Sequence, residues 1–193
     1  MLTFVRHGRT VANRERRLLG RLDVDLDDLG RAQAGAVAAY VGPVDRVVCS
    51  PLRRTRQTAE AWGQDVEVDD RWLELDYGDL DGTPLADVDA DVWAAWQGDV
   101  EFVPAGGESL AALGRRVQTA CEELATAAID DHVVVVTHVS PIKAAVAWAL
   151  GVDDDVAWRM FVAPGSVTRI DVGERRRSLR AFNLLDHLDG LGS

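Results

Sequence analysis

The sequence predicts an α/β domain with three layers, α/β/α, around a mostly parallel central sheet, and with a small acidic cap segment inserted. Short apolar runs alternate along the chain with segments of helical pattern, which is typical of parallel βαβ units. The run VVVVTHV at 133–139 is apolar at successive positions, as expected for a strand covered on both faces. A length of 193 residues suits a single domain, 1–193, with its own core.

The first predicted strand covers Leu2 to Arg6, a short run of strand-forming residues that Gly8 ends. A helix is predicted at about 30–40, and a second strand at Val44 to Cys49. The strand near the C-terminus is the apolar run described above. These three strands form the centre of the predicted sheet.

Two further helices are predicted from residues that typically begin and end a helix. Ser50 as N-cap, Pro51 at the first helical position and Gly63 just past the end predict one helix. The same Ser-Pro pair at 140–141 predicts the start of another helix, which Gly151 ends. Each of these helices follows a predicted strand directly.

The segment at about 65–105 differs from the rest of the chain and is predicted to form the cap. Residues 65–101 hold thirteen acidic residues and one arginine. A short helix is expected there at about 86–97. The elements predicted after it are a long helix at 108–129 and a terminal hairpin with strands at 167–172 and 178–184 around a turn at 174–177.

The charge distribution limits the classes of partner. A net charge of −11 argues against nucleic acid, whose binding depends on many contacts from Lys and Arg to phosphate groups. No apolar stretch is long enough to span a membrane, and the two cysteines, Cys49 and Cys121, sit singly in apolar surroundings. We therefore expect a cytoplasmic protein with no membrane association. A homodimer is compatible with the six tryptophans, although burial in the core is their expected use.

Polar side chains follow all three central strands. Ligands of parallel α/β sheets bind at the carboxyl ends of strands, where the N-termini of the following helices also point. If the three strands are neighbours, two histidines and at least two arginines meet at one point and form an anion site with a potential nucleophile. The residues concerned are Arg6 and His7 after the first strand, Ser50, Arg53 and Arg54 after the second, and Thr137 and His138 after the third.

Five segments, in order, resemble the motifs of the histidine phosphatase superfamily, which contains phosphoglycerate mutases and many phosphatases. They are FVRHGRTVAN, SPLRRTRQTA, LELDYGDLDG, PAGGESL and VVVVTHVSP. The length and motif layout are similar to those of its phosphatase branch, including α-ribazole phosphatases and broad-specificity phosphatases. Five motifs in the family's order indicate the superfamily far more specifically than any single motif does.

The resemblance implies a role for each matching residue. His7 is implied as the nucleophile, Arg6, Arg54 and His138 as the phosphate clamp, and Glu74 as the proton donor. Arg54 rather than Arg53 occupies the family position. The implied substrate-binding residues are Asn13, Gly8, Thr10, Leu19, Gly20 and Val139, with Ser50 and Ser109 as weaker supporting candidates.

The chemistry needs these residue types. A phosphomonoester dianion repels nucleophiles until cations neutralise its oxygens, and arginine and a protonated His138 would do this. His7 must instead be neutral to attack phosphorus. A carboxylic acid such as Glu74 could donate a proton to the leaving alkoxide if burial or the dianion keeps it protonated. Neither a metal ion nor another cofactor is expected, because no metal-ligand spacing is present.

We therefore expect a metal-independent phosphatase that hydrolyses a small phosphorylated metabolite through phosphohistidine. The cap holds no cation between Arg71 and Arg115, so it should repel a multiply anionic substrate, which favours a neutral, apolar or cationic leaving group. The alternatives are a phosphoglycerate-mutase-type phosphoryl transferase, a phosphate-binding regulatory protein without turnover, and a phosphatase of phosphoproteins.

Overall fold

A six-stranded sheet forms the centre of the computed structural model, which describes residues 1–173 and 176–191. Within these residues the strand order is β3-β2-β4-β1-β5-β6. The pairs β3/β2, β2/β4 and β4/β1 are parallel, whereas β5 and β6 form an antiparallel hairpin beside β1. The strands are β1 (Leu2–Arg6), β2 (Arg46–Cys49), β3 (Val66–Val68), β4 (Val133–Thr137), β5 (Val167–Val172) and β6 (Arg177–Leu184).

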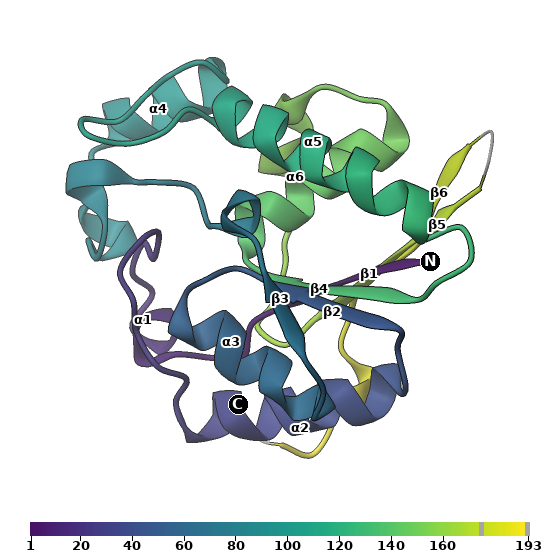
Figure 1. Ribbon diagram of the computed structural model, residues 1–193. Helices are drawn as coiled ribbons and strands as arrows, with labels where there is room; N and C mark the ends of the chain where they lie inside the picture. The colour runs from purple at the N-terminus through teal and green to yellow at the C-terminus, as the bar shows by residue number, and fades with distance from the viewer. Residues whose placement is uncertain (174–175, 192–193) are drawn as a thin grey trace.

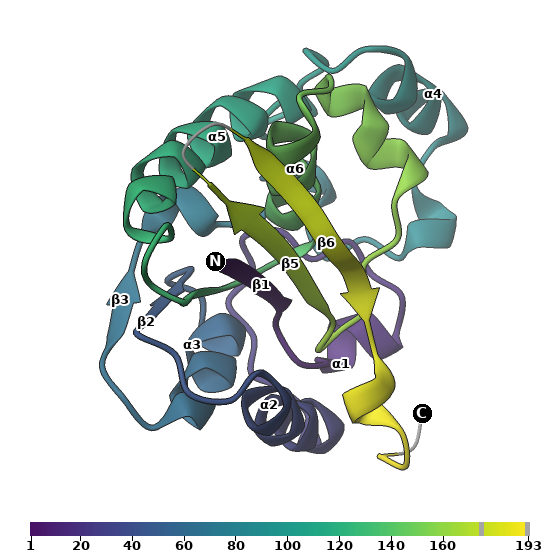
Figure 2. The same ribbon diagram turned by 90° about the vertical axis from the view of Figure 1, so that its right-hand side faces the viewer.

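Helices cover both faces of the sheet (Figures 1 and 2). One face carries α5 and α6 and the other carries α2 and α3, while α4 lies at the periphery. The predicted three-layer α/β architecture is therefore confirmed. The helices are α1 (Val11–Arg14), α2 (Asp28–Val41), α3 (Arg53–Ala59), α4 (Ala90–Gly98), α5 (Leu110–Ala127) and α6 (Val139–Leu150), and short 3₁₀ turns include η2 (Asp70–Trp72) and η5 (Asp154–Arg159).

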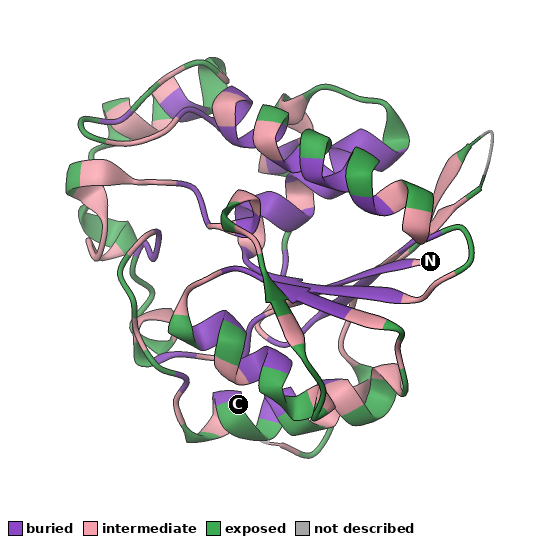
Figure 3. Ribbon diagram, in the orientation of Figure 1, coloured by how far each residue is buried: buried purple, intermediate pink, exposed green. Residues whose placement is uncertain are grey.

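The core consists of two apolar clusters, one on each side of the sheet (Figure 3). Along β4, Val133 and Val135 belong to the cluster with α5 and α6, whereas Val134 and Val136 belong to the opposite cluster. This alternation follows from the two-residue period of a strand. It explains why four consecutive valines, all fully buried, are stable at the centre of the sheet.

The Ser-Pro pairs do not begin the helices, contrary to the sequence prediction. Helix α3 begins at Arg53 with Leu52 as N-cap, so Ser50 precedes the helix. Helix α6 begins two residues earlier than predicted, with His138 as N-cap, and its Ser-Pro pair lies inside the first turn, where proline is tolerated. In both cases the hydroxyl group is free for other contacts, and at Ser50 it reaches a histidine ring.

The helix ends agree better with prediction. Gly63 ends the 3₁₀ turn that continues α3, and Gly151 ends α6; both adopt the left-handed conformation that glycine allows. Ser109 caps α5, and Asp89 rather than a residue near 86 caps α4, since its side chain accepts a hydrogen bond from the N–H of Asp91. Residues 174–175 of the predicted hairpin turn lie outside the described residues.

The segment predicted as a cap contributes to the sheet as well. Its residues 66–68 are β3, the edge strand paired with β2. Farther along, α4 packs through a small third cluster of Leu18, Val88 and Trp96. Among the described residues, no helix combines the length and the hydropathy needed to cross a membrane.

Candidate active site

The carboxyl ends of three adjacent parallel strands bring the predicted residues together. In the register of the sheet, Arg6 on β1 lies opposite Thr137 on β4, so His7 and His138 follow at the same edge. Their ring centroids are 5.2 Å apart. On the other side of β4, the N–H of Ser50 donates to the carbonyl of Val136. The condition set by the sequence, that the three strands be neighbours, is met.

His7 is buried in a fixed tautomer. Its Nδ1 lies 2.7 Å from the carbonyl oxygen of Gly8. Because a carbonyl only accepts, Nδ1 carries the hydrogen and Nε2 keeps its lone pair. Burial, together with Arg54 and Arg6, lowers the pKa of His7 well below 6.5. The neutral imidazole that the sequence analysis required is thus the stable form.

His138 is fully buried beside it. Its Nε2 lies 2.9 Å from the hydroxyl oxygen of Ser50, and its Nδ1 has no hydrogen-bond partner among the described residues. Burial, then Arg54 and His7, lower the pKa of His138 well below 6.5. A phosphate dianion beside the ring would favour the imidazolium, so the protonated His138 expected in the complex stays a prediction.

Two guanidinium groups lie beside the histidines: Arg54 is fully buried and Arg6 is half-buried. Arg54 donates through Nη1 to the carbonyl of Leu22 (2.7 Å) and through Nη2 to that of Gly20 (2.8 Å), and Arg6 donates through Nη1 to that of Val162 (2.7 Å). The Nε atoms of both arginines are buried without a partner in the described part of the chain. Burial lowers the pKa of each arginine to about 10, so both remain cationic at neutral pH.

Arg53 is not part of this group, as the motif comparison predicted. It is exposed and pairs with Asp23 and Asp25. Neighbouring arginines at the start of α3 thus differ in environment because one faces the protein interior and the other faces solvent.

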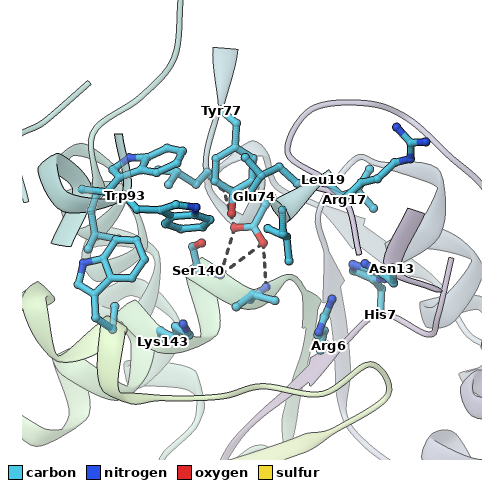
Figure 4. Close-up of a pocket in the computed structure, with 18 residues that line it drawn as sticks. Arg6, His7, Asn13, Arg17, Leu19, Glu74, Tyr77, Trp93, Ser140 and Lys143 are labelled. Atoms are coloured by element: carbon cyan, nitrogen blue, oxygen red, sulfur yellow. Dashed lines mark hydrogen bonds between the residues drawn. The ribbon is translucent and has the colours of Figure 1, made fainter. Parts of the chain in front are cut away.

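Glu74 is 3% exposed and is held by the first turn of α6 (Figure 4). Its carboxylate accepts hydrogen bonds from the backbone N–H groups of Val139 (3.0 Å) and Ser140 (3.1 Å) and from its own neighbour Leu75 (2.8 Å). A helix N-terminus supplies such unpaired donors. These contacts fix the carboxylate in the wall of a cavity.

This cavity, of about 290 Å³, is the space in which a ligand would meet these groups (Figure 4). Arg6, His7 and Glu74 line it, and so do three predicted substrate-binding residues: Asn13, Leu19 and Val139. Arg54 and His138 are fully buried behind the lining. Most of the remaining wall is apolar and aromatic: Leu18, Leu75, Tyr77, Leu85, Trp93, Trp96, Leu110, Ala157 and Trp158.

The other predicted residues support the site from outside its wall. Gly8 allows the chain to cross Gly30, because an added Cβ at Gly8 would lie 2.3 Å from the Gly30 carbonyl oxygen. Thr10 caps α1 together with the side chain of Asn13. The carbonyl of Gly20 accepts from Arg54, whereas Ser109 serves as the cap of α5.

Two cations in the wall, Arg17 and Lys143, were not predicted. Lys143 is the only lysine of the sequence and lies four residues after Val139, on the same face of α6. That spacing is the sequence signal that could have identified it. Of the acidic residues in the segment 65–105, only Glu74 lines the cavity wall.

Across the described ranges, no group of three or more His, Cys, Asp or Glu side chains has the arrangement to hold a metal ion.

Comparison with known proteins places these features in a family. The sequence matches the histidine phosphatase superfamily (branch 1) over residues 2–185. It is 34% identical over 199 residues to phosphoserine phosphatase 1 of Hydrogenobacter thermophilus, covering 97% of this chain and 93% of that protein. It is also 34% identical over 177 residues to a bifunctional protein of Mycobacterium tuberculosis, covering 86% of this chain. The chain spans only 49% of the length of that relative.

Among solved structures, a mycobacterial glucosyl-3-phosphoglycerate phosphatase in complex with VO3 is similar over 94% of this chain and 98% of that one. The TM-score is 0.84 and the sequence identity 34%. The similarity therefore includes both the sheet and the helices that surround the cavity.

Proposed function

The chain belongs to the histidine phosphatase superfamily, and on that premise we propose that it hydrolyses small phosphomonoesters through a phosphohistidine intermediate. One observation carries the proposal. Three buried nitrogen atoms lack a protein partner among the described residues: Nε of Arg6, Nε of Arg54 and Nδ1 of His138. They lie beside the neutral imidazole of His7, whose Nε2 keeps its lone pair. Buried donors are normally satisfied, and a phosphate group supplies the missing acceptors.

In the first half of the reaction the phosphate oxygens bind this clamp, and a proton on His138 completes it. Nε2 of His7 attacks phosphorus in line with the ester bond. As the new P–N bond forms, the P–O ester bond breaks and its electron pair passes to the leaving oxygen. Glu74, entering as the carboxylic acid, gives that oxygen its proton.

In the second half, water attacks the phosphorus of phospho-His7. Glu74, now a carboxylate, takes the proton of the water, the P–N bond breaks, and its electron pair returns to Nε2. Orthophosphate leaves, and the starting protonation states are restored. The names of the relatives, which are phosphatases, support transfer to water.

The test compares wild type, His7→Ala and Glu74→Gln on 4-nitrophenyl phosphate and on glycerol 3-phosphate, in EDTA. We expect His7→Ala to fall to the background rate on both. Glu74→Gln should lose roughly 10²- to 10⁴-fold in kcat/KM on glycerol 3-phosphate, the usual range for a general acid, but far less in kcat/KM on the aryl ester, whose leaving group needs no proton. Its kcat should fall on both esters, because hydrolysis of phospho-His7 also uses Glu74. Quenching in alkaline detergent should trap a phosphoenzyme, labile to later acid treatment, in wild type and Glu74→Gln but not in His7→Ala.

His132→Ala is the matched control, because His132 contacts Thr3 rather than the cavity and should leave the rates unchanged. Equal background rates in all proteins would refute the phosphatase proposal. A His7→Ala protein as active as wild type would show that the nucleophile is assigned wrongly. Faster exchange of phosphate between phosphoglycerates than release of phosphate would favour a mutase.

A further inference from the structure

Lys143 is a cation in the cavity wall that the phosphate clamp does not use. It lies one turn along α6 from the two residues whose N–H groups hold Glu74. Within residues 1–173 and 176–191 it forms no salt bridge and no side-chain hydrogen bond. Burial lowers its pKa, while the negative charge of Glu74 opposes this effect. A half-buried ammonium group without a partner is costly unless a ligand supplies an anion.

The same wall contains two further N–H donors. Trp96 and Trp158 line the cavity, and their indole N–H groups are buried without a partner in the described chain. The acidic side chain in the wall is Glu74, which accepts hydrogen bonds from three backbone N–H groups and serves as the proton donor of the proposed reaction. Arg17, the other added cation, is engaged with Glu15 and with the carbonyl of Gly82.

The position of Lys143 separates it from the phosphate clamp. Figure 4 shows Lys143 and His7 on opposite sides of Glu74. Since Glu74 protonates the leaving oxygen in the proposed reaction, a substrate would reach from His7 past Glu74 towards Lys143. The group that meets Lys143 is therefore part of the leaving alcohol.

We propose that Lys143 binds a carboxylate on the leaving alcohol, so that the protein prefers small phosphomonoesters whose alcohol carries a carboxylate. This inference rests on the proposed function and reverses the preference for a neutral, apolar or cationic leaving group that the acidic composition of the cap suggested. The size of the cavity, about 290 Å³, suits a small molecule of this kind.

The test uses two substrates that differ at one carbon, 3-phosphoglycerate and glycerol 3-phosphate, the first carrying a carboxylate where the second carries a hydroxymethyl group. Wild type should have the higher kcat/KM for 3-phosphoglycerate. In Lys143→Met the ratio of the two kcat/KM values should fall about 10- to 100-fold, as expected for loss of a charge-assisted hydrogen bond. The change should appear mainly in KM, because the carboxylate is bound before and during the reaction.

Two variants complete the design. Lys143→Arg keeps the charge and should recover most of the ratio. Arg115→Met removes a cation outside the cavity, one that pairs with Glu101 on the surface, and should leave the ratio at the wild-type value.

The outcomes separate this inference from the function on which it rests. An unchanged ratio in Lys143→Met, or an equal loss on both substrates, would overturn the role of Lys143 and leave the phosphatase proposal standing. If wild type hydrolyses 4-nitrophenyl phosphate but neither 3-phosphoglycerate nor glycerol 3-phosphate, the role of Lys143 is again overturned and the phosphatase proposal stands. If wild type hydrolyses none of the three, the proposed function fails, and the inference fails with it.

Discussion

His7 and His138 share one buried environment, yet each ring is held differently. The Gly8 carbonyl fixes the hydrogen of His7 on Nδ1, whereas His138 contacts a hydroxyl group, which can donate or accept. One ring is therefore committed to a single tautomer, and the other can gain a proton without breaking its contact. This difference in partners suits the two opposite protonation states of the proposed reaction.

The lowered pKa values of the two histidines predict a loss of stability in acid. In the folded protein both rings stay neutral, whereas the unfolded chain takes up protons below its ordinary pKa of 6.5. Below that pH the unfolded state binds more protons, so the free energy of unfolding falls as pH falls. Each histidine contributes up to about 1.4 kcal/mol per pH unit until its folded pKa is reached.

Urea denaturation between pH 7.5 and 5 measures this dependence. Below pH 6.5 the free energy of unfolding should fall less steeply in His138→Gln than in wild type, because the variant lacks one of the two histidines. The carboxylates are common to both proteins, so their effect cancels in the comparison. Identical pH slopes in the two proteins would contradict a lowered pKa of His138 in the folded state. Inorganic phosphate should reduce the decline in wild type, since the bound anion favours the protonated ring.

At the scale of elements, the segment that carries Glu74 is fixed from two sides. On one side, Thr137 at the end of β4 donates to the carbonyl of Trp72 (2.6 Å). On the other side, Arg116 of α5 donates to the carbonyls of Arg71 (2.6 Å) and Glu74 (3.2 Å) and pairs with Glu108 (2.8 Å). Arg116 is thus a positioning residue for Glu74 and does not itself line the cavity.

Replacing Arg116 should therefore impair proton donation more than phosphate binding. In Arg116→Met we expect kcat/KM on glycerol 3-phosphate to fall by about 10-fold, while kcat/KM on 4-nitrophenyl phosphate changes little, because only the alkoxide needs a proton as it leaves. Steady-state kinetics on both substrates make the measurement. Arg115→Met, from the neighbouring exposed position, is the control.

An equal loss on the two substrates would mean that Arg116 acts on the fold as a whole. If Arg116→Lys restores part of the kcat/KM on glycerol 3-phosphate that Arg116→Met loses, positioning is supported. A lysine can reach one of the two carbonyls but cannot form the paired contacts.

For the molecule as a whole, the cavity lies between the large cluster on the α5 and α6 side of the sheet and a smaller cluster. The smaller cluster consists of Leu18, Val88 and Trp96, with Trp93 and Trp158 packed against it. Trp96 and Trp93 belong to α4, and Trp158 belongs to η5, so two peripheral segments close over the ligand space. Aromatic contacts connect them: the ring centroids of Trp93 and Trp158 are 6.3 Å apart.

Trp96, which is 1% exposed, is the largest buried side chain of this cluster. Trp96→Ala should cost about 3–5 kcal/mol of local packing. Because the cluster is separate from the two that cover the sheet, the loss should open α4 rather than unfold the protein. Hydrogen exchange should therefore speed up at 90–98 and stay slow in β1 and β4. A uniform loss of protection along the chain would contradict this division.

The sequence by itself determined the features that depend on near neighbours in the chain. The apolar runs set β1 and β4, the glycines ended their helices, and the polar residues that follow each strand identified Arg6, His7 and His138 as members of one site. These inferences succeeded because strand ends in a parallel sheet share one edge, so local order along the chain fixes position in space.

The tertiary structure alone decided how each group is surrounded. It placed the acidic side chains of the segment 65–105 away from the cavity, Glu74 excepted, and brought Lys143 into the wall. It freed Ser50 from the predicted cap to contact His138, and it kept that histidine neutral. The reason is physical: burial and through-space charge act between residues far apart in the chain, and composition averages over both faces of a segment.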